Sequence, residues 1–85
     1  MRVEHTLEVV AVCPVDNAGD RYRVTVRCNR TIPVEDILKA VKECSSAPCY
    51  QEDFTQALSR SIVAEVESAG YHSGVWTVVV CGGGE

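Results

Sequence analysis

The chain has 85 residues, of which 46% are hydrophobic and 24% are charged, and its formal net charge is −4. This length allows one domain, residues 1–85, with a modest core, and the hydrophobic content argues against disorder. No apolar run approaches the length of a membrane span, and the first ten residues lack the pattern of a signal peptide. We therefore expect a cytoplasmic protein with no membrane partner. The acidic balance argues against nucleic acid as a partner.

Five cysteines, an odd number, occur without a secretory signal, and this favours reduced thiols over a disulfide scaffold. No C-x-x-C pair occurs, so no metal site is expected. A short chain that has neither disulfides nor metal usually gains stability by association, so we expect a homo-oligomer.

The first half of the chain predicts an antiparallel hairpin followed by a helix. Residues 3–13 are rich in β-branched side chains and contain neither Gly nor Pro, which is typical of a strand. A turn follows at residues 14–20, and residues 21–28 alternate between polar and apolar side chains as a return strand does. Its arginines indicate a solvated face or a subunit contact, with a phosphate site as the alternative. Pro33 can then open a helix with one buried stripe, formed by Val34, Ile37, Leu38 and Val41.

The second half predicts another helix and another hairpin. Apolar residues recur at every fourth position over residues 50–62, strands fit residues 64–71 and 75–81, and a turn fits residues 72–74. Residues 82–85 form a flexible Gly-rich tail. The predicted fold is α+β, a four-stranded antiparallel sheet with two helices on one face, in the order β-β-α-α-β-β. Pairing of its exposed edges between subunits would close a barrel.

Cys13 and Asp20 flank the first hairpin loop, so they can approach each other across its mouth. A thiol with a stabilised thiolate is a nucleophile, and a neighbouring carboxylic acid can protonate the atom that develops charge. The alternative is a buried cysteine beside a turn aspartate. Cys49 is a rival thiol, because the dipole of the second helix is expected to lower its pKa.

Glu52 lies in the first turn of the second helix, where a carboxylate can accept two parallel hydrogen bonds. That geometry suits the N–H pair of a guanine or pterin ring, and the alternative is a glutamate that only complements the helix dipole. His72, in the predicted turn, can act as an acid, as a base or as a surface residue. We assign it, with Glu52, to substrate binding.

Taken together, these features resemble the tunnelling fold (T-fold) of purine- and pterin-binding enzymes. The segment CPVDNAGD, residues 13–20, resembles the CPxTGQPD motif of the 7-cyano-7-deazaguanine nitrile reductases of queuosine biosynthesis. The segment YQED, residues 50–53, resembles their FHED stretch. The resemblance covers most of the chain. It places Cys13 on the nucleophilic cysteine, Pro14 on the proline that follows it, Asp20 on the acid and Glu52 on the glutamate that anchors the base.

The resemblance implies that Cys13 adds to a nitrile carbon to form a thioimide while Asp20 protonates the nitrile nitrogen. It also implies a homo-oligomer of four or five subunits or of stacked rings. The reductases carry an ESKSLK motif tied to NADPH, which has no counterpart in residues 30–41, and related amidinotransferases act on the same nitrile in tRNA without reduction. Two alternatives remain, a pterin- or GTP-handling T-fold enzyme and a non-catalytic purine-binding subunit.

Overall fold

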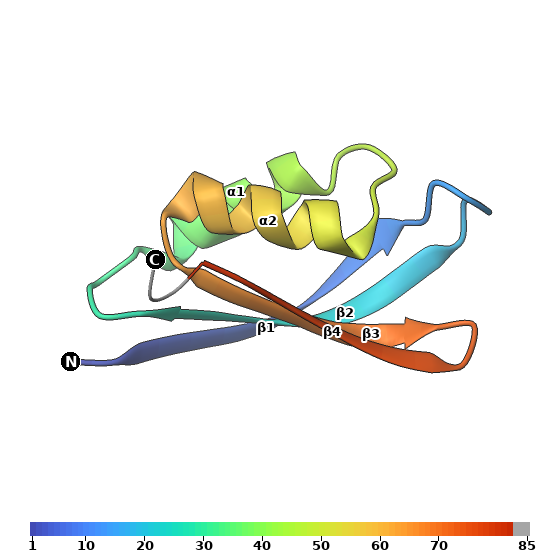
Figure 1. Cartoon of the computed structure of the whole chain (residues 1–85). Coiled ribbons are helices and arrows are strands. Elements are labelled where there is room, and N and C mark those ends of the chain that lie inside the picture. Colours follow the sequence, from blue (N-terminus) through green and yellow to red (C-terminus); the bar gives the residue numbers. More distant parts are fainter. Residues whose placement is uncertain (83–85) are drawn as a thin grey trace.

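The computed structural model describes residues 1–82 and confirms the α+β class and the β-β-α-α-β-β order. The elements are β1 (Val3–Val12), β2 (Gly19–Cys28), α1 (Val34–Cys44), α2 (Gln51–Ile62), β3 (Glu65–His72) and β4 (Val75–Cys81). The strands form one antiparallel sheet in the order β1-β2-β3-β4, and both helices lie on the same face of it (Figure 1). The molecule measures 40 × 22 × 20 Å. Most of the predicted flexible tail lies outside the described residues.

The strand register decides which side chains face the helices. Val9 pairs with Tyr22, Val24 pairs with Ser68, and Ser68 pairs with Val79. Because side chains alternate along a strand, every second residue from these positions points toward the helices. Tyr22, Val24 and Ser68 are each at most 1% exposed, so this face of the sheet is the core.

The core lies between the middle of the sheet and helix α2. Tyr22, Phe54 and Leu58 are its largest buried apolar side chains, and the rings of Tyr22 and Phe54 lie 6.3 Å apart. Gly70 permits this packing, because a Cβ atom at that position would lie 2.6 Å from the Arg21 carbonyl oxygen and 2.8 Å from the Tyr22 ring. Tyr22 is thereby held against the backbone of β3.

The stripe predicted for α1 is partly wrong. Val34 and Leu38 are 52% and 53% exposed, and the buried face is formed by Ile37, Ala40 and Val41. Successive helical residues are about 100° apart, so a stripe centred on Ile37 and its i+3 and i+4 neighbours leaves Leu38 on the flank. Two apolar side chains of α1 therefore face outward.

The turn predicted at residues 72–74 is also misplaced, because His72 is the last residue of β3. The two connecting residues are Ser73 and Gly74, with φ angles of +48° and +83°. Positive φ at both central positions characterises the tight hairpin turn that matches strand twist. His72 is consequently aligned by the sheet and not by a loop.

Within the described residues, no helix is both long and apolar enough to cross a membrane.

Candidate active site

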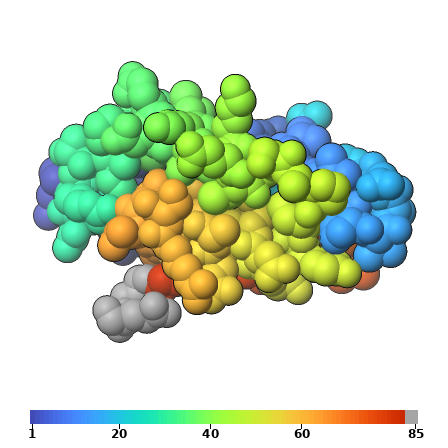
Figure 2. All heavy atoms as spheres, turned by 90° about the horizontal axis from the view of Figure 1, so that it is seen from above, coloured from blue at the N-terminus to red at the C-terminus, as the bar shows by residue number. Residues whose placement is uncertain are grey.

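The two motif segments meet at the end of the sheet where α2 begins. The backbone N–H of Cys49 donates a 3.0 Å hydrogen bond to the carbonyl oxygen of Val12, the last residue of β1. This bond ties the segment that leads into α2 to the first hairpin. Figure 2 shows the loop after β1, in blue, beside the start of α2, in yellow-green.

A cavity of about 380 Å³ opens at this junction. It receives side chains from the first hairpin, the start of α2 and the second hairpin. Its lining residues are Cys13, Pro14, Asp20, Tyr22, Cys49, Tyr50, Gln51, Glu52, His72, Val75 and Thr77. All four residues singled out from the sequence, Cys13, Asp20, Glu52 and His72, line it.

The hairpin places Cys13 and Asp20 on one face of the sheet. Asp20 pairs with Ala11, and Cys13 is two residues beyond Ala11, so Cys13 and Asp20 are diagonal neighbours on the side covered by the helices. The loop between them is closed by two backbone hydrogen bonds, from Cys13 N–H to Ala18 O at 2.8 Å and from Asn17 N–H to Cys13 O at 2.9 Å. The thiol therefore sits on a tightly closed loop.

Asp16 is a site neighbour that was not predicted from the sequence. Its carboxylate accepts a 2.9 Å hydrogen bond from the Ala18 N–H. This backbone bond, and after it the neighbouring Cys13 thiol, lower the pKa of Asp16. An aspartate whose side chain bonds the N–H two residues further on is a common turn feature, and this is the signal that marks the position.

Strand register brings His72 to Asp20. β2 pairs with β3 through Arg23 and Ala69, and the same register continued by three residues sets Asp20 opposite His72. The His72 Nδ1 atom lies 3.2 Å from Asp20 Oδ2, and its ring centroid lies 5.5 Å from that of Tyr22. The two groups thus contact each other directly across the sheet.

Gln51, which stands where the reductase motif has histidine, lies at the centre of a buried network. Its side chain is 2% exposed, and its amide nitrogen lies 3.1–3.2 Å from Ser68 O, Ser68 Oγ and Thr77 O. Its Oε1 lies 2.7 Å from His72 Nε2. Gln51 thereby links the start of α2 to β3 and β4. The sequence offered one signal for it, a polar residue at the first position of a helix, and this signal does not reveal a buried role.

The hydroxyl of Tyr22 contacts the carboxylate of Asp20. It donates a 3.5 Å hydrogen bond to Asp20 Oδ2. Burial, and after it the negative charge of Asp20, raises the pKa of Tyr22, so the phenol keeps its proton and remains a donor. Asp20 is thus contacted by one phenol and one imidazole.

Glu52 and Cys49 enter the cavity from the start of α2. Glu52, in the first turn, is exposed and lines the cavity opening. Burial, followed by the charge of Asp53, raises the pKa of the Cys49 thiol. The expectation that Cys49 is an acidic thiol is therefore wrong, because removal from water and the neighbouring carboxylate both disfavour the thiolate.

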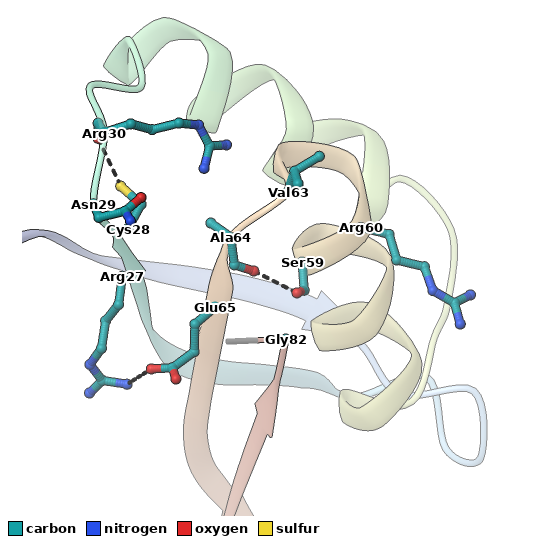
Figure 3. A pocket seen from close by; sticks show the side chains of 10 residues that line it. All are labelled: Arg27, Cys28, Asn29, Arg30, Ser59, Arg60, Val63, Ala64, Glu65 and Gly82. Atoms are coloured by element: carbon teal, nitrogen blue, oxygen red, sulfur yellow. Dashed lines mark hydrogen bonds and ion pairs between the residues drawn. The ribbon is translucent and has the colours of Figure 1, made fainter. Parts of the chain in front are cut away.

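A larger hollow of about 580 Å³ lies at the opposite end of the sheet (Figure 3). Its arginines do not converge on a common point. Arg27 turns to the carboxylate of Glu65 at 3.1 Å, Arg30 donates to the carbonyl oxygen of Ile62, and Arg60 points away from the hollow. These side chains serve the fold and do not form an anion site.

Potential metal ligands are not clustered in the described part of the chain. Residues 1–82 contain no group of three or more His, Cys, Asp or Glu side chains placed to hold a metal ion.

The order and arrangement of the elements are those of a tunnelling fold, with two helices inserted between two hairpins on one face of the sheet. Among solved structures, the chain is similar to the crystal structure of the archaeosine synthase QueF-Like in the apo form. The TM-score is 0.80, and the alignment covers 94% of this chain and 90% of that chain at 20% sequence identity. At this identity the likeness establishes the fold. No protein-family model matches the sequence, and the search of curated proteins gave no match.

Proposed function

We propose that this protein binds a 7-deazaguanine-type base in the cavity at the start of α2 and adds the Cys13 thiol to the nitrile of that base. One observation carries the proposal. Cys13 and Asp20 come from one segment and Glu52 from another, some thirty residues later, and all three line a single cavity of about 380 Å³. A cavity of this size lies within the usual range for small-ligand sites.

Each residue has a separate task in this reaction. Glu52 accepts two N–H groups from the edge of the ring and fixes its orientation. Cys13 attacks the nitrile carbon, so that a C–S bond forms and one C–N π bond breaks. Asp20, which lies on the same face as Cys13, delivers a proton to the nitrile nitrogen. The product is a covalent thioimide.

The residues of one chain do not fit NADPH. Among the described residues, no lysine or arginine lines the cavity, whereas the carboxylates of Asp20 and Glu52 do. The phosphates of the cofactor require cationic partners. We therefore propose no reduction of the thioimide. The chain shares its fold with a protein named archaeosine synthase, and this likeness supports amidino-transfer chemistry in place of reduction.

Intact-mass spectrometry after incubation with 7-cyano-7-deazaguanine tests the proposal. We expect the wild-type protein to gain the mass of one nitrile base, with the adduct located on the peptide that contains Cys13. Cys13→Ala should abolish the adduct, and Asp20→Asn should slow its formation. Cys49→Ala is the matched control, because Cys49 lines the same cavity with a raised thiol pKa, and it should leave the adduct in place.

Two results would contradict the nitrile reaction: an adduct that persists in Cys13→Ala, or no adduct in the wild type. Tight binding of the base without an adduct would instead support a non-catalytic purine-binding subunit or a pterin- or GTP-handling enzyme, in which Glu52 keeps its role and Cys13 is not the nucleophile.

A further inference from the structure

The orientation of the Gln51 side chain follows from its neighbours. One end of its amide lies 3.2 Å from Ser68 O and 3.1 Å from Thr77 O, and both are backbone carbonyl oxygens that can only accept hydrogen bonds. The group that faces them must therefore be the NH₂, and the group that faces His72 must be Oε1. The orientation of the Gln51 amide is thus fixed by two backbone carbonyl oxygens, which cannot donate a hydrogen bond.

The neighbouring hydroxyls complete a network with one direction. Thr55 Oγ1 donates to the backbone carbonyl oxygen of Gln51 at 2.6 Å. The 2.6 Å contact between the Thr55 and Ser68 hydroxyls must therefore use the proton of Ser68. Ser68 Oγ also lies 3.1 Å from the Gln51 NH₂, whose two protons are therefore shared among Ser68 O, Ser68 Oγ and Thr77 O. Because all three atoms act as acceptors toward this group, the two ends of the Gln51 amide cannot exchange places.

The protonation of His72 follows in turn. Since Gln51 Oε1 can only accept, the 2.7 Å contact requires a proton on His72 Nε2. The opposite ring nitrogen, Nδ1, lies 3.2 Å from Asp20 Oδ2. A bare Nδ1 lone pair facing a carboxylate would be repulsive, so this contact requires one more proton, located either on Nδ1 or on Asp20.

We propose that Asp20 and His72 hold one transferable proton between them and that this shared proton is the one delivered to the bound ligand. His72 is the positioning residue, because its contact with Asp20 keeps the shared proton at the cavity. Delivery to a nitrile depends on the proposed function above, whereas the shared proton does not. Gln51 is the residue that makes the arrangement obligatory, because it fixes the Nε2–H form of the imidazole.

The other titratable groups around the pair do not supply this proton. Tyr22 donates to Asp20 but retains its proton, because burial raises its pKa. Cys49, whose pKa is also raised, and Glu52 line the cavity from α2, and Cys13 lines it from the first hairpin. Of these, the Cys13 thiol is the group that loses its proton in the reaction.

The proton balance closes on this basis. As the C–S bond forms, the shared proton moves to the nitrile nitrogen, and the proton released by the Cys13 thiol refills the pair. The sum is the addition of S–H across one C–N π bond, with no oxidant or reductant consumed. Asp20 and His72 end the step in the state in which they began it.

The shared proton can be tested without any ligand. In protein labelled with ¹⁵N-histidine, long-range ¹H–¹⁵N correlation spectra distinguish a protonated from a bare ring nitrogen. We expect His72 to keep a protonated Nε2 at every pH at which the protein is folded, and Gln51→Met to release this constraint. A bare Nε2 with a protonated Nδ1 in the wild type would overturn the proposal, and this wild-type result decides it even if Gln51→Met fails to fold.

Proton delivery is tested by the rate of adduct formation with 7-cyano-7-deazaguanine, measured as a function of pH. His72→Gln should slow the reaction about tenfold or more and change its pH profile. His5→Gln is the control, because His5 lies on β1 outside the cavity, and it should leave rate and profile unchanged.

The outcomes separate the two proposals. An unchanged rate and profile in His72→Gln would overturn proton delivery by the pair and leave the thioimide chemistry intact. Absence of any wild-type adduct would remove both the nitrile chemistry and the delivery step, while the spectra would still decide whether His72 carries the Nε2 proton that the arrangement requires.

Discussion

Glu52 is the exposed carboxylate of the cavity, whereas Asp20 contacts His72 and Tyr22. In Glu52→Gln one of two acceptors becomes an N–H group that faces a ring N–H. We expect the affinity for a guanine-like base to fall about 10- to 100-fold, measured by calorimetry.

Asp53→Asn is the matched control for this prediction. Both residues are acidic, lie in the first turn of α2 and are exposed, so both substitutions remove the same kind of charge from the helix N-terminus, but Asp53 does not line the cavity. Equal affinities for the two variants, with equal losses of stability, would show that Glu52 only complements the helix dipole.

Short-range patterns made part of the site predictable. Cys13, Asp20 and Glu52 belong to contiguous segments whose spacing can be read directly, and the structure brings them to one cavity. The link from Asp20 through His72 to Gln51 was not predictable, because it depends on the β2–β3 register and on a turn that begins one residue later than expected. Both are tertiary properties that a local pattern does not contain.

At the scale of elements, helix α2 ends in an unfavourable backbone conformation. Its C-cap, Val63, has a φ of +53°, a region that β-branched residues rarely adopt, and its side chain is 73% exposed. Glycine at position 63 has no Cβ atom, so it relieves the steric cost of the positive φ. Because the Val63 side chain is exposed, its removal loses little buried surface. We expect Val63→Gly to increase the free energy of unfolding by about 1 kcal/mol, measured by denaturant titration.

Leu38→Gly provides the comparison, since Leu38 is also exposed but lies in the middle of α1. At that position glycine adds only conformational freedom to the chain. The same titration should show that the free energy of unfolding falls by about 1 kcal/mol. Destabilisation by both substitutions would show that Val63 contributes packing that outweighs its strain.

The elements themselves were largely predictable, because period-two and period-four patterns in this chain are clear. The failure in α1 is instructive. Val34 and Leu38 are apolar, and they widen the apparent stripe, but a helix that packs over the core from one side buries only the residues nearest the sheet and α2. Sequence pattern indicates which residues are apolar, whereas packing decides which of them are covered.

At the scale of the whole molecule, the sheet is open at both edges, β1 and β4, within the described residues. The face of β4 that points away from the helices carries three half-exposed apolar side chains, Trp76, Val78 and Val80, at 51%, 48% and 53% exposure. Open edges and uncovered apolar surface both favour association. We expect sedimentation at micromolar concentration to give the mass of an oligomer and not that of a single chain.

Two matched substitutions test which face associates. Val78→Lys places a charge on the outer face of β4, and it should reduce the oligomer mass. Val34→Lys makes the same change at similar exposure on the helical layer, and it should leave the mass unchanged. A monomeric wild type would contradict the prediction of assembly.

The two open edges are also the first and the last strand in chain order. The strands follow one another across the sheet in chain order, each antiparallel to the last, so β4 finishes at the same end of the sheet at which β1 starts (Figure 1). A second β1 placed beside β4 would therefore run antiparallel to it, and a hairpin-sized connection would suffice to reach it. Head-to-tail duplication of the coding sequence would extend the meander without a crossover. The architecture thus offers a direct route from a repeated subunit to a single longer chain.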